Sequence, residues 1–181
     1  MQRTTRIIGF LAVALSISPA ILSAQTKPTQ QSRNDGFWIG VGLGYGSLGC
    51  GECDGTRAGA LASSIRLGGT VSPKVRVGVS SDSWIDSGDG LLTMNNLSAV
   101  VTFFPKATGG FHLTGGLGLS TVTEGGFDGS AEVGAGGIIG IGYDAAVGGR
   151  FSLTPYMNLL VGKYQEGTLN MLQFGIAATW P

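Results

Sequence analysis

The sequence predicts an all-β fold, an eight-stranded antiparallel up-and-down transmembrane β-barrel preceded by a signal peptide. Three observations predict it: segments in which apolar residues alternate with glycine or polar residues, an export-type N-terminus, and an excess of glycine. The 181 residues include 33 glycines, far above the usual ~7%, without the every-third-residue period of collagen. Only 12% of the residues are charged, which argues against a disordered chain.

Residues 1–24 have the pattern of a secretory signal peptide. Arg3 and Arg6 precede an apolar run at 7–17, which suits a signal sequence and is too short to span a bilayer as a helix. Small residues up to Ala24 provide a cleavage site. We therefore expect a signal peptide at 1–24, a disordered polar leader at 25–36 and the outer-membrane β-barrel at 37–181.

Beyond the signal peptide the composition excludes two classes of protein. No run of 18 apolar residues remains, so a membrane-spanning form has to be a closed barrel, the other structure that pairs every backbone group. Without Arg3 and Arg6, nine Lys and Arg residues stand against eleven Asp and Glu residues. We expect no nucleic-acid partner, because that requires a clustered basic face.

The first strand begins at Phe37, where a period of two sets in. On one face lie Phe37, Ile39, Val41, Leu43 and Tyr45, and on the other Trp38, Gly40, Gly42, Gly44 and Gly46. This alternation is typical of a β-strand, since successive side chains point to opposite faces. Seven further strands are expected near 58–70, 75–85, 91–104, 111–123, 131–143, 150–163 and 169–180.

The connections between these segments alternate in charge. The odd ones are polar and acidic (SLGCGECDGT, DSGDG, TEGGFDG and QEGT), and the even ones carry Lys74, Lys106 or Arg150. Eight up-and-down strands bring both termini to the side of the even connections. This arrangement predicts short periplasmic turns and acidic loops outside the cell.

The aromatic residues predict two interfacial girdles. Phe37, Trp38, Phe103, Phe104, Phe111, Tyr143, Phe151 and Trp180 fall at the periplasmic ends of strands, and Tyr45, Trp84 and Tyr164 at the opposite ends. Girdles of this kind lie at the lipid headgroups of outer-membrane barrels. The alternative is a soluble β-sandwich or calyx, which would turn the apolar face inward.

Three stretches, FHLTGGLGLS, FWIGVGLGYG and LQFGIAATW, resemble the outer-membrane β-barrel domain family, the OmpA/OmpX-type small eight-stranded barrels. The resemblance covers 37–181. It implies a bacterial outer-membrane location, contact with outer-membrane lipid and lipopolysaccharide, and folding by the barrel-assembly machinery, which reads a terminal aromatic residue. Here the aromatic is Trp180, one residue before the end. We expect a monomer.

Cys50 and Cys53 form a CxxC motif in the first acidic loop. A redox pair would need a following helix to lower the thiol pKa, and a zinc site would need four ligands. In an oxidising compartment a small disulfide between Cys50 and Cys53 is the simplest interpretation. Free or intermolecular thiols, and a redox or metal site, are the alternatives.

Polar residues on the inward face predict a plugged lumen. The predicted lumen charge cluster consists of Arg66, Arg76, Asp82 and Glu132, with Asn158 and Gln173 also facing inward, because buried charges need partners. Tyr156 and Trp38 are expected to help fill the bore. Such carboxylates could also mark catalysis, but no nucleophile lies beside them.

His112 suggests the barrel lipid A deacylases, but only a threonine follows at the required spacing, and a histidine packed in the lumen is preferred. We expect no enzyme and no cofactor. The sequence therefore predicts a structural or surface-interaction barrel with a plugged lumen. The alternative function is a lipid-active enzyme or a conduit for small apolar molecules. The acidic loops form a solvated rim or bind divalent cations at a lipopolysaccharide surface.

Overall fold

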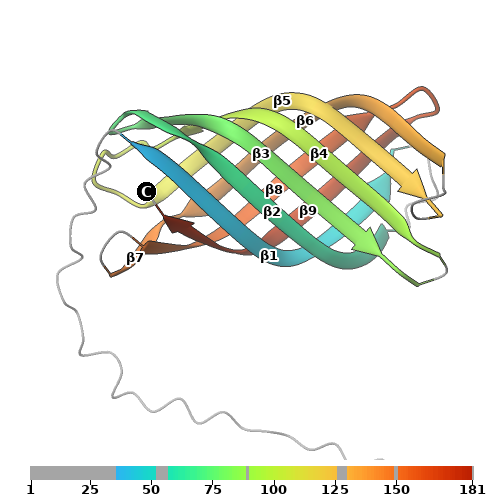
Figure 1. Cartoon of the computed structure of the whole chain (residues 1–181), viewed down its shortest axis with the longest axis horizontal. Helices are drawn as coiled ribbons and strands as arrows, with labels where there is room; N and C mark the ends of the chain where they lie inside the picture. Colours follow the sequence, from blue (N-terminus) through green and yellow to red (C-terminus); the bar gives the residue numbers. More distant parts are fainter. Residues whose placement is uncertain (1–35, 52–56, 89, 126–129, 149–150, 181) are drawn as a thin grey trace, which may run out of the picture.

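Figure 1 shows a computed structural model of the chain. It describes residues 36–51, 57–88, 90–125, 130–148 and 151–180. The predicted signal peptide at 1–24 and residues 25–35 of the predicted leader lie outside the described residues. Both assignments stay predictions.

The described part of the chain consists of β-strands that close into a barrel. They are β1 (Phe37–Cys50), β2 (Arg57–Ser72), β3 (Val75–Asp86), β4 (Leu92–Phe103), β5 (Phe111–Glu124), β6 (Ser130–Tyr143), β7 (Ala145–Gly148), β8 (Phe151–Lys163) and β9 (Thr168–Trp180). Consecutive strands from β1 to β6 pair in an antiparallel sense, as do β7 with β8 and β8 with β9, while β1 pairs with β9 and β6 pairs with β8. The predicted all-β, up-and-down barrel is confirmed.

β6 and β7 are two parts of one barrel strand, interrupted at Asp144. Gly142 of β6 lies opposite Tyr156 of β8, and Ala145 of β7 lies opposite Leu153, so the register continues across the break. Counted together they give eight strands. The sequence prediction ended this strand at 143 and treated the following residues as a turn.

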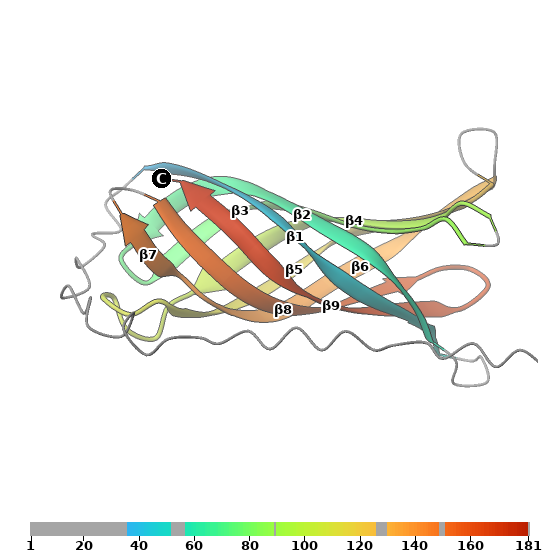
Figure 2. The same cartoon turned by 90° about the horizontal axis from the view of Figure 1, so that it is seen from below.

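The connections gather at two ends of the barrel, which Figure 2 shows from below. The turn end contains the start of β1, the end of β9 and the β2–β3, β4–β5 and β7–β8 connections. The loop end contains the β1–β2, β3–β4, β5–β6 and β8–β9 connections. Both ends of the barrel chain therefore lie on the side predicted to be periplasmic.

The outward face of the barrel is apolar along its long strands. Its exposed side chains include Val41, Leu43, Leu61, Ile65, Val79, Leu97, Val101, Leu117, Leu119, Ile139, Met157, Val161 and Ile176. Leu117 is 78% exposed. A soluble sandwich or calyx would bury this face, whereas a membrane barrel turns an apolar band to the lipid.

No helix in the described ranges is long and apolar enough to cross a membrane.

The aromatic residues divide between the two faces of the barrel. Phe37, Tyr45, Phe103, Phe111, Tyr143 and Trp180 are exposed, as predicted for girdles. The girdle prediction is wrong for Trp38, Trp84, Phe104 and Tyr164, which are buried, whereas the burial of Trp38 agrees with the expectation that it helps to fill the bore. Phe37 and Trp38 are consecutive on β1, so only one of them can face the lipid, and Phe104 follows Phe103, the last residue of β4.

Glycines on the inward face allow close approach and make room for large side chains. Gly44 of β1 lies opposite Gly175 of β9, and a Cβ added to either would meet the backbone of the other strand. A Cβ on Gly46 would lie 2.5 Å from the Trp84 ring, and one on Gly42 would lie 3.0 Å from the Tyr156 ring. The glycine face therefore accommodates the rings that fill the lumen.

Candidate functional site in the barrel lumen

The charged residues of the lumen form two groups, and the first lies near the turn end. Arg76 of β3 donates from Nη1 to Asp144 Oδ2 over 3.1 Å, and both side chains are buried. Thr154 of β8 donates to Asp144 Oδ1 over 2.9 Å. The interruption between β6 and β7 thus places a carboxylate beside residues from two other strands.

His112 of β5 completes this group. Its Nδ1 lies 3.2 Å from the Gly110 carbonyl oxygen and 3.6 Å from Asp144 Oδ1. The imidazole also packs on the Phe104 ring, with 5.1 Å between centroids. His112 is buried, as predicted for a histidine packed in the lumen.

Aromatic rings cover the Arg76 guanidinium. Its Cζ lies 5.6 Å from the Trp38 ring centroid and 5.2 Å from that of Phe104. Contacts of this kind stabilise a desolvated cation, in addition to its ion pair. Hydrogen bonds from the guanidinium run in its own plane.

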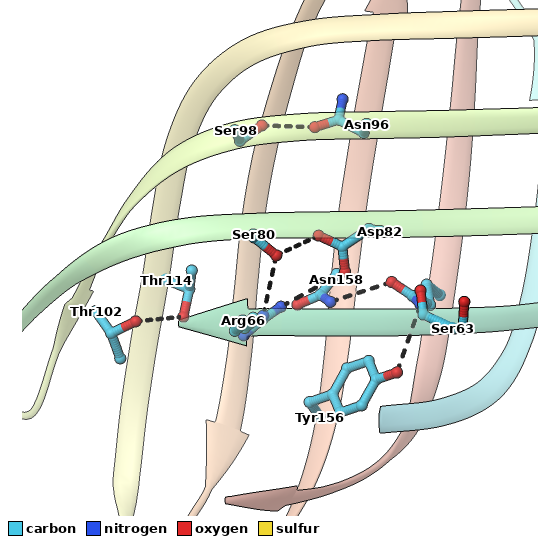
Figure 3. A network of polar contacts seen from close by, with 11 residues as sticks. Ser63, Arg66, Ser80, Asp82, Asn96, Ser98, Thr102, Thr114, Tyr156 and Asn158 are labelled. Carbon is cyan, nitrogen blue, oxygen red and sulfur yellow. Dashed lines mark hydrogen bonds and ion pairs between the residues drawn. The ribbon is translucent and has the colours of Figure 1, made fainter. Parts of the chain in front are cut away.

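The second group lies further along the lumen and is drawn in Figure 3. Arg66 Nε donates to Ser80 Oγ over 3.2 Å, and Ser80 Oγ donates to Asp82 Oδ2. Arg66 Nη2 and Asp82 Oδ1 are 3.9 Å apart, an ion pair too long for a direct hydrogen bond. The Tyr156 ring lies 5.7 Å from Arg66 Cζ.

A network of amides adjoins this second group in Figure 3. Asn158 Nδ2 donates to Gln173 Oε1 over 3.2 Å, and Gln173 Nε2 donates to the Ser63 carbonyl oxygen over 3.1 Å. Tyr156 Oη lies 3.4 Å from Gln173 Nε2. Asn158 and Gln173 both face inward, as their position in the strands predicts.

Toward the loop end, the lumen is filled by apolar side chains that the sequence analysis did not place inside the barrel. The apolar cluster consists of Leu48, Trp84, Met94, Val100, Ile138, Leu160 and Met171. Trp84, Met94, Leu160 and Met171 have no exposed surface. The Trp84 indole also donates to the Gly46 carbonyl oxygen over 2.9 Å, so its polar atom is satisfied.

The predicted charge cluster is therefore only partly assembled. Arg66, Arg76 and Asp82 lie inside the lumen, but Glu132 does not join them. Glu132 lies near the loop end of β6, where its carboxylate accepts a hydrogen bond from the Gln165 backbone N–H over 2.8 Å. The partner of Arg76 is Asp144, which the sequence analysis missed because it falls at a predicted strand end.

Two other expectations about sites have different outcomes. Cys50 ends β1 opposite Leu169, but Cys53 lies outside the described residues, so the Cys50–Cys53 disulfide stays a prediction. The described contacts of His112 are a carbonyl, a carboxylate and an aromatic ring, and they include no hydroxyl or thiol nucleophile. Within the described ranges, no cluster of three or more His, Cys, Asp or Glu side chains is arranged to hold a metal ion.

Comparison with known proteins identifies the fold and no family. No protein-family model matches the sequence, and no curated protein matches it. Neisserial surface protein A (NspA) has a similar structure, with a TM-score of 0.68 at 12% identity over 80% of this chain and 96% of that chain. Ail, the attachment invasion locus protein of Yersinia pestis, gives a TM-score of 0.55 at 12% identity over 80% and 97%.

A second Ail structure, in complex with the heparin analogue sucrose octasulfate, gives 0.56 at 12% identity over 81% of this chain and 99% of that chain. The chain therefore has the fold of the small outer-membrane β-barrels, which confirms the resemblance predicted from the sequence. The apolar outward belt suits the outer-membrane location of such barrels.

Proposed function

We propose that this chain is a closed barrel of the bacterial outer membrane with a structural or surface-interaction role. The observation that carries this proposal is the filled lumen. Most of the apolar cluster lies in the loop half, and the paired charges extend from the middle of the lumen into the turn half. An eight-stranded wall encloses little more than its own side chains, so a filled lumen favours a scaffold over a conduit.

The contacts in the lumen also argue against an enzyme. A hydrolase needs a nucleophile, a base and a group that orients the base. The pair of His112 and Asp144 could supply the last two, but in the described structure no nucleophile lies within hydrogen-bond distance of the imidazole. We infer that the pair serves the packing of the lumen.

The loop end suits a surface role with a cationic partner. Glu124, Glu132 and Glu166 line one groove there, and the sequence adds Glu52, Asp54, Asp89 and Asp128 to the same loops. The Ail structure named above holds a polyanion, sucrose octasulfate. An acidic rim would repel such a ligand and attract cations, including the divalent ions that bridge lipopolysaccharide.

The remaining partners follow from this location. We propose contact with outer-membrane lipid and lipopolysaccharide along the apolar belt, insertion by the barrel-assembly machinery, and a monomeric state. The closed ring of paired strands leaves no long sheet edge for a second copy to extend, which favours a monomer.

Planar-bilayer recordings test the closed barrel. The wild-type protein is expected to give no steady ion current, because the apolar cluster and the charged residues leave no continuous aqueous path. A stable open conductance would overturn the proposal and support the conduit.

Labelling of intact cells tests the orientation. Cysteines introduced by Ser87→Cys at the loop end and Lys106→Cys at the turn end are both at exposed positions. With an impermeant thiol reagent, only the Ser87→Cys variant is expected to react above the wild-type background. Labelling of the Lys106→Cys variant alone would invert the topology.

A further inference from the structure

A small cavity in the turn half of the lumen has more hydrogen-bond donors than the protein uses. Its volume is about 40 Å³, and its lining includes Trp38, Arg66, Arg76, His112 and Tyr156. A space of this size accommodates a few water molecules or one small ion. None of the residues given above for its lining belongs to the apolar cluster.

Three N–H groups of residues that line this cavity are buried without a hydrogen-bond partner among the described residues. They are Trp38 Nε1, Arg66 Nη2 and Arg76 Nε. Trp38 is 5% exposed and Arg76 is 6% exposed. An orphaned donor at this depth destabilises the protein unless a ligand accepts its hydrogen bond. Three from three strands around one cavity indicate a site for an acceptor.

The nearby carboxylates accept no hydrogen bond from these three N–H groups in the described structure. Asp144 accepts from Arg76 Nη1 through one oxygen and from Thr154 through the other. Asp82 accepts from Ser80 through Oδ2, whereas Asp82 Oδ1 is buried without a hydrogen-bond partner and lies 3.9 Å from Arg66 Nη2, too far for a direct hydrogen bond. The rings of Trp38 and Phe104 cover the Arg76 guanidinium, so its free Nε–H can only be met in the guanidinium plane.

We propose that this cavity binds a small monovalent anion, such as a halide or formate, between Trp38, Arg66 and Arg76. The N–H groups of Arg66 and Arg76 belong to charged donors, which make stronger hydrogen bonds to an anion than neutral donors do. Two carboxylates already balance the arginines, so the ion is held by directed N–H groups and not by surplus charge. A divalent anion such as sulfate is therefore excluded on charge as well as on size. This inference rests on the lumen geometry and is independent of the proposed function.

Bromide is the probe for this site. Thermal unfolding of the full chain in detergent micelles is followed while bromide replaces sulfate at constant ionic strength. Sulfate stabilises proteins in general because it is excluded from their surface. Replacing it by bromide should therefore lower the unfolding temperature even without a binding site. If bromide binds in the cavity, the unfolding temperature also gains an increase that saturates as the bromide concentration rises. A fall without saturation would overturn the proposal.

A matched pair of variants locates the site. Trp38→Phe keeps an aromatic ring over Arg76 and removes one N–H donor, and it should weaken the bromide response about tenfold, the effect of one hydrogen bond to a charged group. Trp180→Phe, at an exposed position, should leave the response unchanged. Equal responses of the two variants would place the bromide elsewhere and overturn the proposal.

Crystals of the wild-type protein grown in bromide provide a measurement that does not depend on a variant. We expect one anomalous peak within hydrogen-bond distance of Trp38 Nε1, Arg66 Nη2 and Arg76 Nε. Bromide found only at the protein surface, with water alone in the cavity, would refute the site even if the unfolding temperature responds to bromide.

Discussion

The two halves of the lumen are closed by different physical means. The apolar cluster toward the loop end excludes water by packing, and its one indole N–H is bonded to a carbonyl. The turn half is filled by two arginines, two aspartates and a histidine that depend on particular partners. Packing tolerates small changes of shape, whereas a buried charge that loses its partner has no substitute. The halves should therefore respond differently to substitution.

The largest effect is expected from Asp144→Ala in the turn half. It removes the carboxylate that accepts from Arg76 and Thr154 and leaves a buried guanidinium without its ion pair. The free energy of unfolding, measured by urea denaturation in micelles, should fall by about 3–5 kcal/mol. Glu132→Ala is the control, since that carboxylate lies near the loop end and accepts only an exposed backbone hydrogen bond. Equal losses in both variants would contradict the assignment of Asp144 to Arg76.

The apolar cluster is tested by Met94→Ala. Met94 has no exposed surface, so truncation leaves a cavity and should cost about 2–5 kcal/mol in the free energy of unfolding. The matched control is Met157→Ala on the outward face, where Met157 is 45% exposed and lipid or detergent can fill the space. If the Met157→Ala variant lost as much, the loop half of the lumen would not be the packed region.

The sequence predicted which charged residues face the lumen, but it did not predict the role of Asp144 or the apolar cluster. The period of two correctly placed Arg66, Arg76 and Asp82 inside the barrel, since parity along a strand fixes the face of each residue. Parity does not show where along the barrel axis a side chain lies, nor which residue of another strand it contacts. Glu132 has the parity of an inward residue, but it lies near the loop end and away from the two arginines. Asp144 lies where the alternation is interrupted.

The apolar cluster was missed for a related reason. Trp84, Met94 and Met171 face inward, although the alternation was interpreted as apolar outside and polar inside. Trp84 interrupts the pattern of β3, Met94 that of β4, and Met171 precedes the regular alternation of β9. A packed lumen brings together residues from many strands, and local periodicity carries no information about such contacts.

A smaller effect in the turn half is expected from Ser80→Ala. Ser80 accepts from Arg66 Nε and donates to Asp82, so it bridges an ion pair whose charged atoms are 3.9 Å apart. Its removal should lower the free energy of unfolding by about 1–3 kcal/mol. Ser83→Ala is the control, because Ser83 donates to Asn95 at an exposed site. A harmless Ser80→Ala variant would mean that Arg66 and Asp82 need no bridge.

The smallest effect concerns Tyr164, just past the end of β8, whose hydroxyl lies 2.7 Å from Ser120 Oγ in the loop half. Tyr164→Phe should cost about 0.5–1.5 kcal/mol at neutral pH.

Burial raises the pKa of the Tyr164 phenol, against a smaller opposing effect of the Ser120 hydrogen bond. The unfolded chain therefore loses this proton first, and the contribution of Tyr164, complete below about pH 10, is lost as the pH rises through its folded pKa. The stability difference between wild type and Tyr164→Phe, measured by urea unfolding at successive pH values, should shrink above about pH 10. A difference that stays constant to higher pH would show that the phenol is already in contact with water, and that the packed region ends before it reaches Tyr164.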